Sequence, residues 1–97
     1  MNGEYLNEIK SSNPSGVCVD ELNHIYVSKN SNHQILKIDL NGNQIWKIGG
    51  SGKNDGQFNN PIHLKYSSKY QHLIVCDTGN HRIQILLGSV TPYKFQY

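Results

Sequence analysis

Short apolar runs alternate with polar turns along the chain. Seven runs are rich in β-branched and aromatic residues, and Asn, Asp, Gly and Ser separate them. This alternation is typical of antiparallel strands joined by tight turns. No segment shows the three- and four-residue apolar spacing of an amphipathic helix. The pattern predicts strands at residues 16–20, 24–28, 33–39, 44–48, 62–66, 72–76 and 82–87.

One of these hairpins occurs twice. Residues 75–85 have a degraded copy at residues 27–35, in which Asn32-His33 matches Asn80-His81 at an offset of 48. The flanking apolar positions also match at this offset. A hairpin that recurs at a fixed period indicates a repeat architecture, because each unit buries its apolar surface against the next one.

The period divides residues 1–97, which form one partial domain, into four segments. Residues 1–12 match residues 41–48 in part and are predicted to hold the last strand of a preceding unit and a linker. Residues 13–51 form the first repeat, and the Gly-rich residues 52–60 join the units, with Phe58 as the expected anchor. Residues 61–97 form the second repeat, which is atypical after residue 88 and has its fourth strand predicted at residues 93–97.

The turn residues suggest specific local geometry. Asn41-Gly42 lies between two apolar runs and predicts a type I′ turn, which needs positive φ at both central residues. Gly79 is expected to supply positive φ in its own turn. Asp77 and Asn80 carry side chains that can bond turn backbone groups, and His81 can bond a neighbouring strand. These residues, with Asn32 and His33, are therefore interpreted as structural repeat motifs.

These motifs together resemble the NHL repeat. Residues 77–83 read Asp-Thr-Gly-Asn-His-Arg-Ile, and residues 56–61 before them read Gly-Gln-Phe-Asn-Asn-Pro. Residues 16–20 and 23–27 look like the first two strands of such a repeat. The first unit departs from the family at Lys29-Asn30-Ser31, where Asp-x-Gly is usual. The resemblance implies an all-β, partial β-propeller of the six-bladed type, with about two four-stranded antiparallel blades and one leading strand from a preceding blade.

Composition and charge are those of an ordinary folded chain. The net charge of +2 and the 16% of charged residues argue neither for disorder nor, by themselves, for nucleic acid. Cys18 and Cys76 lie in apolar runs without metal-ligand spacing and are expected to be buried thiols. The N-terminus lacks the pattern of a signal peptide, and no apolar run is long enough for a membrane helix. A cytoplasmic location is the resulting expectation.

No catalytic constellation emerges from the sequence. Residues 50–53 read Gly-Ser-Gly-Lys but fail the spacing of a phosphate-binding loop, and residues 39–42 fail that of a calcium loop. The five histidines form no metal-ligand cluster, and two pairs of them recur at equivalent repeat positions. The sequence therefore predicts no enzyme activity, no cofactor and no catalytic or metal-binding residues.

The resemblance implies a binding surface formed by loops. The leading expectation is a protein partner, with the chain as a scaffold or as the substrate-recruitment part of a ubiquitin-ligase-like protein. The first alternative is single-stranded RNA on a basic, aromatic face, and the candidate partner-binding residues are Lys53, Arg82 and Trp46. The second is a fragment of a lyase-type propeller enzyme, for which no residue set carries over. Because two blades cannot close a ring, self-association or a missing remainder of the propeller is also expected.

Overall fold

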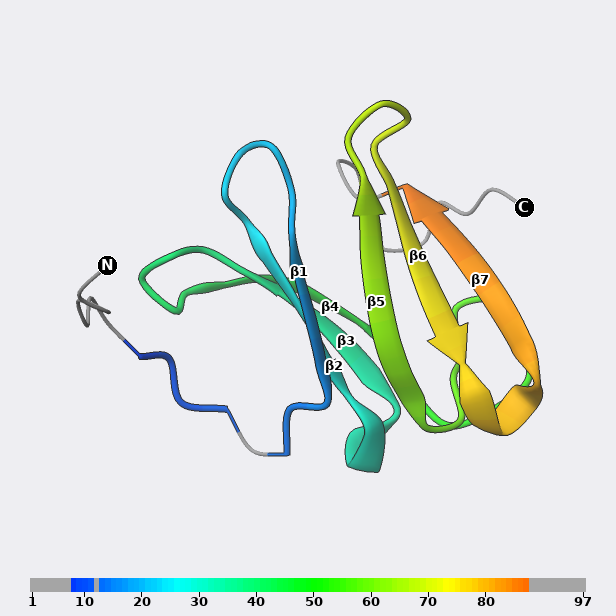
Figure 1. Cartoon of the computed structure of the whole chain (residues 1–97). Coiled ribbons are helices and arrows are strands. Elements are labelled where there is room, and N and C mark those ends of the chain that lie inside the picture. Colours follow the sequence, from blue (N-terminus) through cyan, green and yellow to red (C-terminus); the bar gives the residue numbers. More distant parts are fainter. Residues whose placement is uncertain (1–7, 12, 88–97) are drawn as a thin grey trace, which may run out of the picture.

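The computed structural model describes residues 8–11 and 13–87, which form two antiparallel sheets (Figure 1). The first sheet, blade 1, has the order β1-β2-β3-β4, and the second, blade 2, has the order β5-β6-β7. The strands of blade 1 are β1 (Gly16–Val19), β2 (Ile25–Lys29), β3 (Gln34–Ile38) and β4 (Gln44–Gly49). Those of blade 2 are β5 (Pro61–Ser67), β6 (His72–Asp77) and β7 (Arg82–Leu87). The all-β class with a partial propeller is confirmed.

All seven strands predicted within the described residues are confirmed to within one residue at each end. The alternation that predicts them reflects burial: in β6, Leu73, Val75 and Asp77 are buried and alternate with half-buried residues. The strand predicted in residues 93–97 lies outside the described residues, as does most of the one predicted at residues 2–9. The part of the chain that the structure describes contains no helix long and apolar enough to cross a membrane.

The β3–β4 turn differs from the prediction. Only Gly42 has positive φ, at 88°, whereas Asn41 does not, so the turn is not type I′. The Asp39 carboxylate accepts hydrogen bonds from the N–H groups of Asn41 and Asn43, at 2.9 and 2.8 Å. A backbone bond from Asp39 N to Asn43 O closes a three-residue loop, a common hairpin in which the glycine takes the left-handed position. The Asp39 side chain therefore selects this turn over the tighter one.

The β2–β3 and β6–β7 connections share one backbone. Each is a single 3₁₀ turn, η1 (Asn30–Asn32) or η2 (Thr78–Asn80), followed by a histidine in the left-handed region. Positive φ therefore belongs to His33 and His81, and the prediction that Gly79 supplies it is wrong. Gly79 is required for space instead, because a Cβ there would collide with the side chain and carbonyl of Asn59.

The core lies between the two blades. Tyr26, Ile35 and Ile48 of blade 1 meet Leu73, Val75 and Leu86 of blade 2, and all six are at most 3% exposed. Phe58, from the loop that joins the blades, is fully buried among them, as its predicted role of anchor requires. The innermost strands β1 and β5 lie side by side (Figure 1), and Ser28 Oγ of the neighbouring β2 donates to Ile62 O at 3.0 Å.

The two cysteines are free and half-buried, so they are more accessible than the predicted buried thiols. Cys18 lies at the margin of the core. Its partial burial, together with the charge of Asp20, raises its pKa to about 11. The Cys18 thiol is therefore protonated, and unreactive as a nucleophile, near neutral pH.

Candidate functional site

The loops gather at two opposite ends of the blades. The polar loop end contains η1, η2 and the β4–β5 connection at residues 50–60. The apolar loop end contains the β1–β2, β3–β4 and β5–β6 hairpin loops, at residues 20–24, 39–43 and 68–71. Because consecutive strands of each blade are antiparallel, alternate connections fall at alternate ends.

Asp77 organises the polar loop end. Its carboxylate is fully buried and accepts hydrogen bonds from Asn59 N at 2.7 Å and Arg82 Nε at 2.8 Å. The side-chain amides of Asn80 and Gln84 also donate to it, at 3.0 and 3.3 Å. Burial opposes ionisation, but these hydrogen bonds outweigh it and lower the pKa of Asp77. The carboxylate is therefore a buried, fully satisfied anion.

Arg82 ties Asp77 to the loop that joins the blades. Besides its bond to Asp77, the guanidinium donates from Nη1 to Lys53 O at 2.7 Å. Its Nη2 donates to Asn54 O and Gln57 O, both at 3.0 Å. Gln84 adds a second tie, donating to Gln57 O at 2.7 Å and accepting from Gly56 N at 3.1 Å. Much of the hydrogen-bonding capacity of Arg82 is thus used within the chain.

A polar pocket of about 430 Å³ opens beside this network. It is lined by Lys53, Gly79, Asn80, His81 and Arg82. Asn80 is fixed in its wall by donating to Gly52 O at 2.7 Å. The structure thus brings two predicted partner-binding residues, Lys53 and Arg82, together with three residues of the repeat motif.

The corresponding residues of blade 1 make fewer contacts. His33 Nδ1 accepts from Asn60 N at 3.0 Å, which joins η1 to the start of β5. The Asn32 side chain is exposed. Within residues 8–11 and 13–87, blade 1 has no counterpart of the Asp77 network, because Lys29 stands at the equivalent position.

Trp46, the third predicted partner-binding residue, lies apart from Lys53 and Arg82. It is half-buried on β4, with its ring centroid 5.9 Å from that of Tyr26 and 5.9 Å from Lys37 Nζ. Lys37 is buried, and burial lowers its pKa, while Asp20 Oδ2 lies 3.9 Å from its ammonium group. Trp46 thus belongs to a packed aromatic and cationic cluster between the blades. The partner-binding roles of Trp46, Lys53 and Arg82 stay predictions.

The apolar loop end exposes one large apolar side chain on each of its three loops. Leu22 is 68% exposed, Leu40 55% and Tyr70 59%. The Tyr70 ring stacks on His72 at 5.6 Å, and Lys69 Nζ lies 5.3 Å from its centroid. Large apolar side chains on exposed loops are a feature of many protein interaction surfaces.

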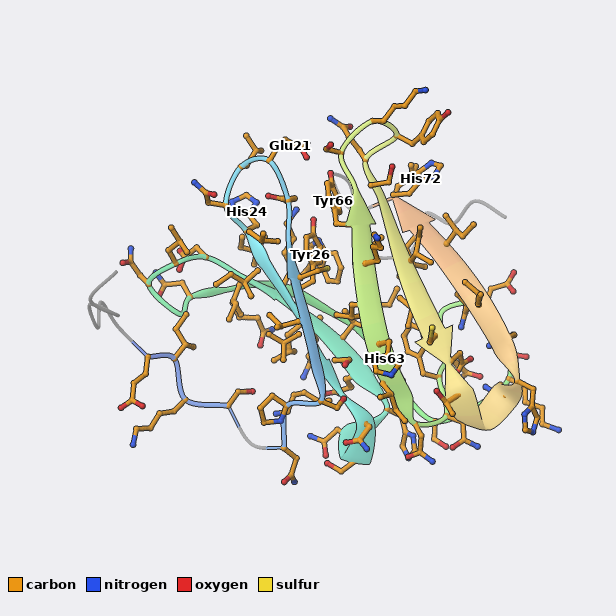
Figure 2. The ribbon with its side chains drawn as sticks, viewed as in Figure 1. Glu21, His24, Tyr26, His63, Tyr66 and His72 are labelled. Carbon is orange, nitrogen blue, oxygen red and sulfur yellow. The ribbon has the colours of Figure 1, made fainter. Side chains whose placement is uncertain are left out.

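Hydrogen bonds between the blades hold two of these loops in place. Glu21, beside Leu22, accepts from Tyr66 Oη at 3.3 Å and from Gln71 Nε2 at 3.4 Å. The Tyr66 ring stacks on Tyr26 at 5.6 Å, and Figure 2 shows Glu21, Tyr66 and Tyr26 together between the blades. Burial and the bond to Glu21 raise the pKa of Tyr66 to about 12, so its hydroxyl stays a donor at neutral pH.

Asp20 fixes the β1–β2 loop from within. Its carboxylate accepts from Leu22 N at 2.9 Å, His24 N at 3.0 Å and Tyr26 Oη at 2.9 Å. Burial opposes ionisation, yet these bonds lower the pKa of Asp20. These bonds agree with the expectation that an Asp in this turn bonds nearby backbone groups, whereas sequence reasoning did not single out Glu21 or Tyr66. The sequence does contain one indication of an exposed surface at this end, which is an apolar residue within each polar turn, as at Leu22 and Leu40.

In the described part of the chain, no group of three or more His, Cys, Asp or Glu side chains is placed to hold a metal ion. A comparison with protein-family models matches the NHL repeat at residues 12–38 and 58–86. The two matched segments correspond to the first three strands of each blade. No curated protein matches the sequence.

Proposed function

Because the chain belongs to the NHL repeat family, we propose that it is a non-catalytic binding module whose apolar loop end takes a protein partner. The observation that carries the proposal is the exposure of Leu22, Leu40 and Tyr70, one on each of the three loops at this end. Surfaces of this kind bury apolar area against a partner, which is the main favourable contribution to association.

Two of these loops are held in place by hydrogen bonds, and this rigidity also favours binding. Asp20 fixes the β1–β2 loop internally, and Glu21 ties it to the β5–β6 hairpin. A surface held in its bound shape loses little conformational entropy on association. Tyr70, stacked on His72, supplies a large rigid contact at the edge of the surface.

The role that suits such a surface is scaffolding or substrate recruitment, as in a ubiquitin-ligase-like protein. In that role the chain contributes recognition, and the chemistry occurs elsewhere.

Quantitative affinity purification with matched variants tests the protein-binding proposal. The wild-type chain, the triple variant Leu22→Ser, Leu40→Ser, Tyr70→Ser and the control Lys53→Ser serve as baits, each with and without ribonuclease. We expect a reproducible set of proteins on the wild-type and control baits, insensitive to ribonuclease, that the triple variant loses. Equal recovery on the triple variant would contradict the proposal.

Single-stranded RNA is the second candidate, and the polar pocket favours it. Lys53, Arg82 and His81 line that pocket together with an amide side chain, and cations with hydrogen-bonding groups suit phosphate and base edges. Fluorescence anisotropy with a labelled oligouridine tests this function. It predicts binding that Lys53→Glu abolishes and that weakens with salt by about −0.7 in log-log slope per phosphate contact. Absence of binding at 50 mM salt would remove the RNA alternative.

A further inference from the structure

Each blade packs one face against the other blade, and no third sheet among the described residues covers its second face, which we call its open face. Successive side chains of a strand point to opposite faces. Tyr26 and Ile35 lie on the packed face of blade 1, so Val27 and Ile38 lie on its open face. Leu73 and Val75 lie on the packed face of blade 2, so Ile74 and Ile83 lie on its open face.

The open face of blade 1 contains an apolar cavity of about 250 Å³, which we call the socket. Six of its seven lining residues have counterparts in the packed face of blade 2 or in the joining loop beside it. At an offset of 47, Ser11, Pro14 and Val17 of the socket correspond to Phe58, Pro61 and Leu64. At an offset of 48, Ile25, Val27 and Ile38 correspond to the core residues Leu73, Val75 and Leu86. The socket is therefore the first repeat's copy of a surface that is already packed in the second.

The surface that would fill the socket also has a copy in the chain. In the interface between the blades, Tyr26 and Ile35 of blade 1 cover the packed face of blade 2. Their equivalents in blade 2, at an offset of 48, are Ile74 and Ile83. Ile35 is fully buried, whereas Ile83 is 62% exposed, and Val17 of the socket is 67% exposed. The two open faces are thus the two halves of one interface, at opposite sides of the molecule.

We propose that the socket receives the open face of blade 2 of a second copy of this chain, in a head-to-tail contact that continues the packing between the blades. Such a contact joins two different surfaces, so it propagates from copy to copy until the rotation closes a ring.

The contact between copies differs from the internal one at the innermost strand. Gly16 lets β1 approach β5, because a Cβ there would collide with Ile62 O and crowd Ser28 Oγ. The equivalent position in blade 2 is His63, whose side chain is exposed. The second copy therefore docks mainly through β6 and β7, and Ser11 leaves unfilled the space that Phe58 fills inside the chain. Both differences make the contact weaker than the internal interface.

Three matched variants test the proposal by sedimentation velocity from 1 to 200 μM of the full chain. Ile83→Glu places a carboxylate on the open face of blade 2, and Val17→Glu places one in the socket. Leu22→Glu is the control, because Leu22 is as exposed as these residues but lies at the apolar loop end. We expect assembly of the wild type and of the control. Each interface variant should weaken assembly by about 100-fold or more, because an unpaired carboxylate is costly to bury. Circular dichroism should show the same β signal for all.

A mixing experiment distinguishes the head-to-tail contact from a symmetric one. The Ile83→Glu chain keeps an intact socket, and the Val17→Glu chain keeps an intact open face of blade 2. We expect the two variants, each monomeric alone, to form a heterodimer when mixed. A wild-type chain that stays folded and monomeric at 200 μM would overturn the proposal. So would assembly that survives both variants, or a mixture that stays monomeric.

Discussion

The two hairpins at residues 25–38 and 72–87 share a backbone but differ in what their side chains hold. In both, a single 3₁₀ turn is followed by a histidine with nearly the same dihedral angles: φ 56° and ψ 44° at His33, φ 55° and ψ 43° at His81. At the first position of the motif, however, Lys29 stands in blade 1 and Asp77 in blade 2. Only Asp77 gathers the hydrogen bonds that reach the joining loop.

The repeat motif therefore has two separate roles, which are forming the turn and holding the joining loop. The turn does not require Asp, Gly and Arg at these positions. Blade 1 has Lys29, Ser31 and Gln34 there and forms the same turn. Both copies keep the flanking apolar strands and the histidine in the left-handed region, and these features suffice for the turn. The additional residues of blade 2 hold a glycine-rich loop of little apolar content against the sheet. The motif is thus a turn with an optional clamp, here the network of Asp77, Asn80, Arg82 and Gln84.

The largest difference between the two hairpins is expected for the substitution Asp77→Asn, paired with Lys29→Asn. The side chains of Asn80, Arg82 and Gln84 all donate to Asp77 Oδ2, and an amide nitrogen in its place could not accept these bonds. The Arg82 guanidinium would also lose its anionic partner. We expect a loss of about 3 kcal/mol in the free energy of unfolding, the usual result of breaking a buried charged pair. Lys29→Asn should change it by less than about 0.5 kcal/mol.

Urea denaturation followed by circular dichroism, at one fixed protein concentration, measures both variants. Equal losses in the two variants would show that the clamp contributes nothing specific to blade 2. The prediction would then fail even if both proteins were destabilised.

The next largest effect is expected from Gly79→Ala, paired with Ser31→Ala at the equivalent position. The new Cβ at position 79 meets the Asn59 side chain and carbonyl, and Gly79 N already donates to that carbonyl at 2.7 Å. Crowding of this kind costs about 2 kcal/mol. Ser31 is exposed, so its replacement should be nearly neutral. Midpoints of thermal unfolding give the comparison, and a neutral Gly79→Ala would show that the joining loop shifts freely.

Gly79 also shows where sequence reasoning reaches its limit. The strands could be predicted to within a residue because alternating burial is a local property of each segment. A glycine, by contrast, serves equally for positive φ or for close approach, and only the position of Asn59, twenty residues earlier, decides between them. The Asn41-Gly42 turn was mispredicted because Asp39 caps it from outside the two-residue motif.

The candidate sites show the same limit. Lys53 and Arg82 share a pocket because the loop at residues 52–57 folds back onto β7, which the sequence pattern does not encode. Glu21 meets Tyr66 across 45 residues, through the packing of one blade on the next. Contacts between elements of different repeats depend on the angle between the sheets. The periodicity indicates that the sheets pack, but it does not indicate which loop residues then meet.

Low pH is expected to remove the stabilisation that the ionised Asp77 carboxylate contributes to the clamp. Because the pKa of Asp77 is lower in the folded chain than its ordinary value of about 3.9, the unfolded chain takes up the proton first as pH falls. The stabilisation is thus complete above pH 5 and is lost as pH falls through the folded pKa. Urea midpoints at pH 6, 5, 4 and 3 should drop for the wild type and drop less for Asp77→Asn. Asp20 and Asp39, whose pKa values are also lowered, are retained in both proteins and account for the remaining slope. Parallel curves for the two proteins would contradict this assignment.

The smallest effect is expected at the asparagine that both copies share. Asn80 donates to Gly52 O at 2.7 Å and to Asp77 Oδ2 at 3.0 Å, whereas the exposed Asn32 side chain makes no hydrogen bond to any described residue. We expect Asn80→Ala to cost about 1 kcal/mol, close to the net value of a protein hydrogen bond, and Asn32→Ala less than about 0.5 kcal/mol. Urea denaturation under identical conditions measures the pair. If the two losses were equal, Asn would stabilise the turn itself in both blades, and the clamp would reduce to Asp77, Arg82 and Gln84. Unequal losses would instead show that a residue kept in both copies acts through its contacts in only one of them.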